Sequence, residues 1–415
     1  MSTQAAKPRI LHCHSTFAPG GKEVRAVKLM NAFGDAFEHT IVSGDPQGMG
    51  ARELISDDVE VHFPPAFPSL RGSPTPGRLA ALAKALKPFD LVLTYNWGAM
   101  DVVMAHSIFT NALGLPPLIH HEDGFNEDEA DELKSSRNWY RRIALWRTHA
   151  LVVPSRTLKR IALDKWGQPA SRIQRIANGI DTAAFARGPQ PGSFRVVKRE
   201  GEKWVGTLAG LRKVKQLDML VRAAADLPEN WHVVILGEGP ERDAIREEAD
   251  RLEISHRVHL PGNVAEPARL IGMFDIFALS SKSEQFPLSV VEAMAAGLPV
   301  AAPDVGDVKD IVSAENRPFI AVPDDAKALG AMLDDLVANE KLRAEIGSAN
   351  RDKAREHFDQ AQMIAAYRAL YDGALQGRGR KSVLNPAFNC TCASLDRQAN
   401  VSSGLTGIAR EGGAP

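Results

Sequence analysis

The sequence predicts an α/β protein built from two similar halves, each with a parallel sheet covered by helices. Short apolar runs, typical of buried strands, alternate with longer segments of helical periodicity over most of the 415 residues. The alternation is interrupted at residues 182–200, which contain the run GPQPG and have the composition of a linker. Two such halves place a cleft between the carboxyl ends of their strands, where open α/β sheets bind ligands.

Both halves follow the same order of strand and helix. The first begins with a strand at residues 10–12, a turn at Pro19, Gly20 and Gly21, and a helical pattern over residues 23–33. Its further strands are expected at residues 39–42, 91–94, 118–120, 150–154 and 173–176. The strands of the second half are expected at residues 204–208, 232–236, 258–260, 276–278 and 299–301.

The end of the chain changes character twice. Residues 359–375 are helical in pattern, with Met363, Tyr367 and Tyr371 on one stripe. Beyond Gly377 the composition shifts to Gly, Ser, Arg and Asn without periodicity, which predicts a disordered tail. We therefore expect domains at residues 1–190 and 191–358, a last helix at 359–376 and a tail at 377–415.

Charge and cysteine content argue against several classes of protein. The formal net charge of -1 disfavours a broad nucleic-acid-binding role. Three cysteines are too few for a secreted disulfide framework and are not spaced like a zinc site, so reduced thiols are expected. The N-terminus lacks an apolar signal core, and no window approaches the roughly 18 apolar residues of a membrane span. These features favour a cytoplasmic protein.

Glu284 and Glu292, with seven residues between them, lie in the segment SEQFPLSVVEAMAAGLPV, residues 283–300. Pro287 suits the first turn of a helix and Gly297 the position just past its end, which predicts a helix over residues 287–296. Glu284 then lies in the loop before a phosphate-attracting helix N-terminus, and Glu292 lies inside the helix. The alternative is a pair of solvated glutamates, but the apolar neighbours of Glu292 favour a paired or cleft-facing side chain.

This stretch resembles the donor-binding signature of retaining glycosyltransferase family 4, also called glycosyl transferases group 1. The family pattern is a glutamate, seven residues and then EAMA-x-G-x-PV, which residues 292–300 match throughout, although Gln285 and Pro287 stand where many members have glycine. The resemblance implies the GT-B fold: two Rossmann-like domains facing across a cleft, with a C-terminal helix that crosses back to the first domain. Residues 1–190 would hold the acceptor and residues 191–358 the nucleotide-sugar donor.

A basic segment at the start of the second half resembles the diphosphate-binding segment of the same family. Arg212 and Lys215 fall on its R-x-x-K positions, although Thr207 stands where many members have arginine. A guanidinium and an ammonium suit a pyrophosphate leaving group, while a solvated basic loop is the alternative. The resemblance also implies donor contacts from three further residues: Gly262 and Asn263 on the nucleobase, and Leu288 at the helix start.

Two motifs of the first half resemble family landmarks near the acceptor. Gly20 and Gly21 match a glycine loop near the acceptor and donor phosphates, and an ordinary turn is the alternative. His120, in IHHEDGF, matches the family's cleft histidine at a strand end, and its neighbour His121 remains open. A structural histidine is the alternative for both.

A helical segment at residues 137–147 mixes Trp139, Tyr140 and Trp146 with several arginines. Such a helix fits contact with a membrane surface or an anionic lipid-linked acceptor. The alternative is a helix packed by its aromatic side chains with its arginines in water.

The predicted function is a retaining glycosyltransferase that moves a sugar from a UDP- or GDP-sugar to a glycan or lipid-linked acceptor in cell-surface polysaccharide synthesis. The resemblance gives Arg212 and Lys215 to the diphosphate, Glu292 to the ribose and Glu284 to the transferred sugar. The chain has no convincing Asp-x-Asp motif, and neither metal nor cofactor is expected. Alternatives are a sugar-nucleotide epimerase or hydrolase of this fold, and a non-catalytic sugar-nucleotide-binding partner. The protein is expected in the cytoplasm or at the inner face of the membrane.

Overall fold

The computed structural model of the chain describes residues 6–125, 127–129, 132–190 and 197–377. Residues up to Leu375 form one compact unit that contains two parallel sheets. The predicted tail, apart from Gly377, and the cysteines at 390 and 392 lie outside the described residues. Cys13 is a free, buried thiol in the first strand.

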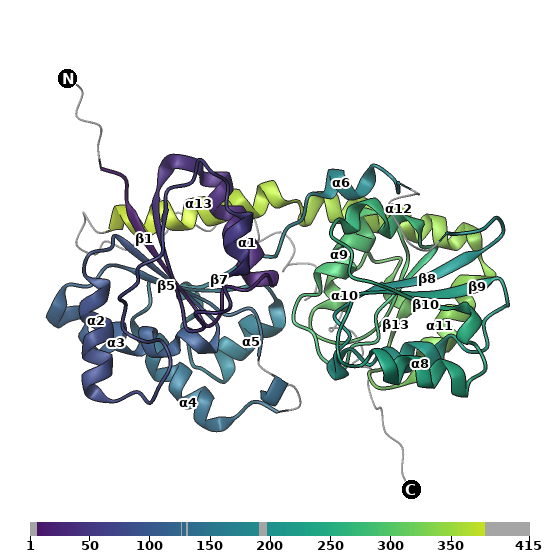
Figure 1. The fold of residues 1–415 in the computed structure, drawn as a ribbon, viewed down its shortest axis with the longest axis horizontal. Coiled ribbons are helices and arrows are strands. Elements are labelled where there is room, and N and C mark those ends of the chain that lie inside the picture. The colour runs from purple at the N-terminus through teal and green to yellow at the C-terminus, as the bar shows by residue number, and fades with distance from the viewer. Residues whose placement is uncertain (1–5, 126, 130–131, 191–196, 378–415) are drawn as a thin grey trace, which may run out of the picture. The chain divides into compact units, whose positions relative to one another are not determined.

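The first sheet has seven strands in the order β3-β2-β1-β4-β5-β6-β7 (Figure 1). Its order changes direction between β1 and β4, which is the switch point of a doubly wound fold. The strands are β1 (Arg9–His14), β2 (Glu38–Ser43), β3 (Val61–His62), β4 (Leu91–Tyr95), β5 (Leu118–His121), β6 (Ala150–Val153) and β7 (Ile173–Arg175). The helices of this half are α1 (Gly21–Phe33), α2 (Pro76–Leu86), α3 (Met100–Leu113), α4 (Ser135–Ala144) and α5 (Arg156–Asp164). The next helix, α6 (Thr182–Ala186), packs on the second half, where Phe185 joins the apolar cluster (Figure 1).

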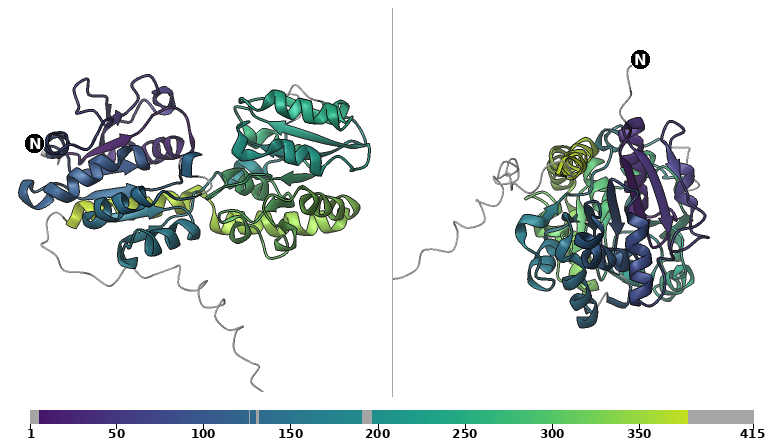
Figure 2. Two further views of the ribbon diagram at one scale, coloured as in Figure 1. Left: turned by 90° about the horizontal axis from the view of Figure 1, so that it is seen from below. Right: turned by 90° about the vertical axis from the view of Figure 1, so that its left-hand side faces the viewer.

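The second sheet has six strands in the order β10-β9-β8-β11-β12-β13, with its switch point between β8 and β11. The strands are β8 (Lys203–Leu208), β9 (Trp231–Leu236), β10 (Val258–Gly262), β11 (Ile276–Ala278), β12 (Val300–Pro303) and β13 (Ile320–Ala321). The helices are α7 (Leu217–Ala223), α8 (Arg242–Arg251), α9 (Leu288–Ala295), α10 (Val308–Ile311), α11 (Ala326–Ala338), α12 (Glu340–His357) and α13 (Gln360–Gln376). Helices cover both faces of each sheet, which explains why the central strands β4, β5, β11 and β12 are buried along their whole length (Figure 2).

The last helix returns to the first sheet. Met363, Tyr367 and Tyr371 of α13 are buried in the same apolar cluster as residues of β1, β4 and β5 (Figure 1). The crossing chain passes over Gly179, where a Cβ atom would lie 2.8 Å from the Cα atom of Gln360. The crossing helix of a GT-B protein is therefore present in this chain.

The sequence predictions of the fold agree with the structure except in three places. Strands β3 and β13 were not expected, because two residues carry too little pattern. The first residues of the predicted linker form α6, which begins where the Asp181 side chain accepts a hydrogen bond from the Ala184 N–H group. The predicted helix at 287–296 is α9, and Pro287 precedes its first residue.

Candidate active site

Lys215 and Glu284 lie together at the carboxyl ends of the second sheet's strands. Lys215 belongs to the short 3-10 turn after β8, and Glu284 to the loop between β11 and α9. The Lys215 ammonium group forms an ion pair with Glu284 Oε1, to which the Ser281 hydroxyl also donates over 2.7 Å. The structure thus brings together two residues that the family resemblance gave to the diphosphate and to the transferred sugar.

The loop that carries Glu284 lies against Gly306, which follows β12. Gly306 has φ +57°, and a Cβ atom there would lie 2.3 Å from the carbonyl oxygen of Glu284. The next residue, Asp307, donates its N–H group to the Gln285 carbonyl over 3.2 Å. Glycine at position 306 has no side chain, and this allows the backbone of the Glu284 loop to approach so closely.

Asp307 also holds the N-terminus of α5. Its carboxylate accepts hydrogen bonds from the backbone N–H groups of Arg156 and Thr157, the second over 3.0 Å. The Thr157 hydroxyl donates to the Gly306 carbonyl over 3.3 Å. An acidic side chain at a helix N-terminus is stabilising, so residues 306 and 307 connect the Glu284 loop to the first half. Asp307 was not among the site residues predicted from the sequence.

Glu292 lies one turn into α9 and is partly buried. Burial raises the pKa of its carboxyl group to about 7, although the positive charge of Lys28 opposes the shift. Leu288, the first residue of α9, is also partly buried. Pro287 has no polar side chain to cap the helix, which leaves the first N–H groups for a ligand or water. A carboxyl group with this pKa can donate as well as accept a hydrogen bond near neutral pH.

Three loops at the carboxyl ends of β8, β9 and β10 are in close contact. Cβ atoms at Gly237 and Gly239 would lie 1.9 and 2.4 Å from the carbonyl oxygens of residues 209 and 211, respectively. Gly262, with φ +100°, accepts a hydrogen bond at its carbonyl from the Gly237 N–H group over 2.9 Å. Glycine at these positions therefore allows the loop that bears Arg212 to pack closely against the neighbouring loops. The side chains of Arg212 and Asn263 are exposed on these loops.

The predicted glycine loop of the first half runs into α1, with Gly20 at the N-cap position and Gly21 as the first residue of the helix. A Cβ atom at Gly20 would lie 2.8 Å from Glu23 Oε2, whereas one at Gly21 would meet no atom within 4 Å. Lys22 forms an ion pair with Glu23, and burial lowers the pKa of the Lys22 ammonium to about 8. A side chain at Gly20 would therefore have to displace the Glu23 carboxylate, and the fold alone gives no reason for glycine at Gly21.

Both histidines at the end of β5 are buried, with exposed fractions of 0% for His120 and 1% for His121. His120 Nδ1 lies 2.8 Å from the Thr94 hydroxyl, and its Nε2 lies 3.5 Å from Glu122. The ring of His121 stacks on that of Tyr95 at a centroid distance of 4.7 Å. In this conformation the protein itself surrounds both rings.

Asp123, just past this strand end, carries a partly exposed charge and was not among the predicted site residues. Its carboxylate pairs with Arg25, whose side chain also donates to Asn178 over 2.8 Å. Burial would raise the pKa of Asp123, but the Arg25 guanidinium outweighs burial and lowers it. At Gly124 a Cβ atom would lie 3.3 Å from Gln285 Cγ, so this loop reaches the Glu284 loop.

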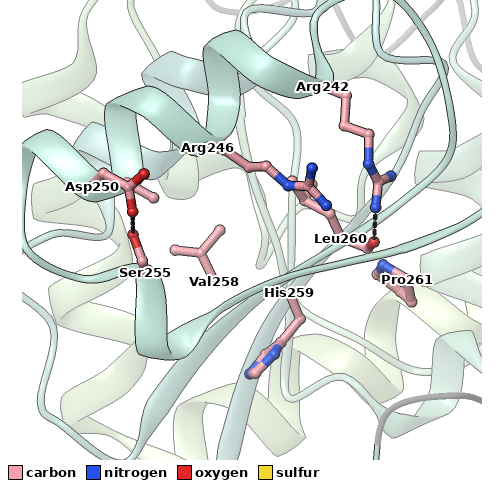
Figure 3. A pocket seen from close by; sticks show the side chains of 9 residues that line it. Arg242, Arg246, Asp250, Ser255, Val258, His259, Leu260 and Pro261 are labelled. Carbon is pink, nitrogen blue, oxygen red and sulfur yellow. Dashed lines mark hydrogen bonds between the residues drawn. The ribbon is translucent and has the colours of Figure 1, made fainter.

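A pocket of about 580 Å³ lies between α8 and the edge strand β10 (Figure 3). The side chains of Arg242 and Arg246 reach toward it from α8, and the Arg242 guanidinium donates to the Leu260 carbonyl over 2.5 Å. None of the predicted site residues lines it. It is thus separate from the arrangement around Glu284.

Comparison with known families gives one match over each half. The sequence profile of glycosyltransferase family 4 matches residues 19–184, and that of glycosyl transferases group 1 matches residues 192–353. The N-acetyl-alpha-D-glucosaminyl L-malate synthase of Bacillus anthracis is 26% identical over 212 residues, which are 50% of this chain and 56% of that protein. The D-inositol 3-phosphate glycosyltransferase of Nocardia farcinica is 33% identical over 196 residues, which are 42% of either chain. The chain thus spans about half the length of these two relatives.

Solved structures match over nearly the whole described part. Anabaena Alr3699/HepE in complex with UDP has a TM-score of 0.73 at 19% identity, with 88% of this chain and 100% of that chain covered. The complex of the same protein with UDP-glucose has a TM-score of 0.69. At this identity the likeness shows the fold, and it agrees with the two sheets and the returning helix. This chain belongs to the glycosyltransferases of group 1 and family 4, with the GT-B fold.

Proposed function

We propose that this glycosyltransferase transfers a sugar from a UDP- or GDP-sugar with retention of anomeric configuration. The observation that carries the proposal is the contact between Lys215 and Glu284, with Arg212 in the same turn as Lys215. In this proposal the Lys215 cation would bind the departing diphosphate and the neighbouring Glu284 carboxylate the sugar hydroxyls. The UDP and UDP-glucose bound to the HepE neighbour support a nucleotide-sugar donor.

The donor would bind through charges and backbone groups at the carboxyl ends of the second sheet. Negative charge develops on the diphosphate as the glycosidic bond breaks, and preorganised cations stabilise that charge. Arg212 and Lys215 supply the cations, and the first turn of α9, at Leu288, supplies N–H groups. Glu292 would bind the ribose hydroxyls, and Gly262 with Asn263 the nucleobase.

The acceptor side would be formed by the first half. Gly21, where the fold has room for a side chain, would allow a phosphate to approach the backbone at the start of α1. His120 is buried, so we propose it as a positioning residue that supports the strand end before Asp123. Asp123 directly precedes Gly124, which lies against Gln285 of the Glu284 loop.

The acceptor is proposed to be a glycan or a lipid-linked acceptor of cell-surface polysaccharide or lipopolysaccharide synthesis. The relatives are named for different acceptors, malate and inositol phosphate, so they do not identify the acceptor of this chain. A lipid-linked acceptor agrees with a peripheral position at the inner membrane face, with contact through residues 137–147. None of the described helices is long and apolar enough to cross a membrane.

The reaction is proposed to need no metal. The described residues do bring three potential ligands together, Glu38, Glu60 and His62, but at the outer edge of the first sheet. Transfer in the presence of EDTA at the rate measured with added Mg²⁺ or Mn²⁺ would agree with the proposal. A dependence on either ion would contradict this part of it alone.

A screen of nucleotide sugars tests the proposal, because a ligand of the native state raises its thermal stability by mass action. UDP- and GDP-sugars are each added to the protein, and the midpoint of unfolding is compared with that in the free nucleoside diphosphate. One nucleotide sugar is expected to raise the midpoint for the wild type and less for Arg212→Ala. The same shift in both proteins would contradict the assignment of Arg212.

A further inference from the structure

Four exposed apolar side chains gather on α3, α4 and the turn after α4. Exposed fractions are 64% for Trp139, 50% for Ile143 and 68% for Trp146, and Ile108 of α3 is 54% exposed. The helices are joined at this point, since the Ser107 hydroxyl donates to the Ala144 carbonyl. Seven large apolar residues are exposed in the described part of the chain, and four of them lie here. We call these four residues the aromatic patch.

The aromatic patch does not contribute to the core. The spacing of 139, 143 and 146 places these side chains on one stripe of the helical segment, while the opposite side holds α4 in place. There the fully buried Arg141 pairs with Glu122 and Glu129 over 3.3 and 3.2 Å. Tyr140 packs on the core as the alternative interpretation of this helix predicted, but Trp139 and Trp146 do not.

Three arginines surround the patch. The Arg142 guanidinium lies 5.7 Å from the centre of the Trp139 ring, and Arg172 donates to the Trp146 carbonyl. Arg147 is exposed beside Trp146. Within the described ranges, none of these three guanidinium groups has a carboxylate at ion-pair distance. The patch therefore combines apolar surface with positive charge that no carboxylate of the described residues pairs with.

This combination fits an anionic membrane surface. Tryptophan is favoured where an apolar layer meets water, because its ring is apolar and its N–H group is polar. Arginines beside it can bind lipid phosphates. A second copy of the chain fits less well, since a two-fold contact would set the same unpaired arginines against one another.

We propose that the aromatic patch docks this protein on anionic membranes. Trp139, Ile143 and Trp146 would enter the headgroup region, while Arg142 and Arg147 contact lipid phosphates. Its use rests on the proposed function, because docking would bring a lipid-linked acceptor to the enzyme. The binding itself requires no sugar transfer, so the two can be measured separately.

The test uses the full chain and vesicles of phosphatidylcholine, with or without an equal part of phosphatidylglycerol. The wild type is expected to co-sediment with the anionic vesicles and to be released by high salt. The variant Trp139→Ala/Trp146→Ala and the variant Arg142→Ala/Arg147→Ala are each expected to bind at least about tenfold more weakly. The control Leu54→Ala/Val322→Ala removes exposed apolar groups elsewhere and should bind like the wild type.

Tryptophan emission reports the contact directly. Brominated lipids should quench the wild type, and the loss of quenching in Trp139→Phe/Trp146→Phe would locate the contact. The other four tryptophans are less accessible, since Trp166, Trp204 and Trp231 are buried and Trp97 is partly buried. Absence of wild-type binding, or undiminished binding of both alanine variants, would overturn the proposal. A wild-type dimer that becomes monomeric in Trp139→Ala/Trp146→Ala, without vesicle binding, would identify a second copy instead. Vesicle binding without transfer to any acceptor would count against the proposed function and not against the patch.

Discussion

The ammonium group of Lys215 contacts the carboxylate of Glu284, although the two residues belong to loops after different strands, β8 and β11. Each side chain is mostly buried, with exposed fractions of 16% and 12%. In the proposed reaction these charges face the two products of bond cleavage, the diphosphate and the sugar. The contact therefore holds both groups in place before a donor arrives.

The cations of the turn after β8 are expected to differ in importance. Arg212→Ala should lower kcat by about a hundredfold or more, because a preorganised partner of the departing diphosphate is lost. The matched control is Lys213→Ala, which removes a neighbouring exposed cation that the diphosphate pattern does not use. Initial rates with the stabilising donor measure both. Equal losses in the two variants would instead support a general basic loop.

Gly306 is expected to be required for the Glu284 loop. Gly306→Ala places a Cβ atom 2.3 Å from the Glu284 carbonyl oxygen at a positive φ, so the loop must move. We expect a loss of about 1 to 3 kcal/mol in the free energy of unfolding and a large loss of transfer. Gly77→Ala in α2, where no atom lies within 4 Å, should be neutral or stabilising in the same urea titration.

Substitution of Gly21 distinguishes a role in packing from a role in ligand binding. Gly21→Ala meets no atom within 4 Å, so the free energy of unfolding should stay within about 0.5 kcal/mol of the wild type. If a phosphate approaches the backbone here, transfer should nevertheless fall markedly, chiefly through KM. Wild-type KM and kcat in a stable Gly21→Ala protein would make the segment an ordinary turn, which is the alternative from its sequence.

Glu292 is expected to reduce stability at neutral pH. Its pKa is raised from 4.5 to about 7, so the folded state favours the protonated form. Its contribution is fully present below pH 4.5 and is lost as the pH rises through about 7. The free energy of unfolding of Glu292→Gln should therefore exceed that of the wild type by about 1 to 3 kcal/mol at pH 8. Near pH 5 the two proteins should differ little.

Urea titrations at the two pH values measure this difference, with Glu345→Gln on the exposed side of α12 as the control. The same variant should bind the donor more weakly if the carboxylate contacts ribose. A gain of equal size at both pH values would show that ionisation of Glu292 is not its cause.

The sequence predicted the order of strands and helices because each element carries its own local pattern. It predicted the helix beside Glu284 from Pro287 and Gly297, which are local signals. Two features of the site depend on loops that meet only after folding, namely the Lys215–Glu284 contact and the binding of Asp307 to the N-terminus of α5. No local sequence pattern predicts such contacts.

The sequence also did not predict which of several candidate site side chains are buried and which are exposed. His120 and His121 end a buried strand beneath other side chains, whereas Trp139 and Trp146 have an apolar composition and yet face outward. From residue type alone, one expects a polar histidine in a cleft to be exposed and an apolar tryptophan to be buried. The arrangement of α3, α4 and α13 decides these positions.

The central claim is tested most directly by the product formed from the stabilising nucleotide sugar and a panel of glycan and lipid-linked acceptors. NMR of the purified product reads the anomeric configuration and shows whether an acceptor carries the sugar. We predict release of the nucleoside diphosphate together with a glycoside that keeps the donor's configuration, and loss of both in Glu284→Gln. An inverted product, an epimerised sugar nucleotide or undiminished transfer by Glu284→Gln would contradict the account.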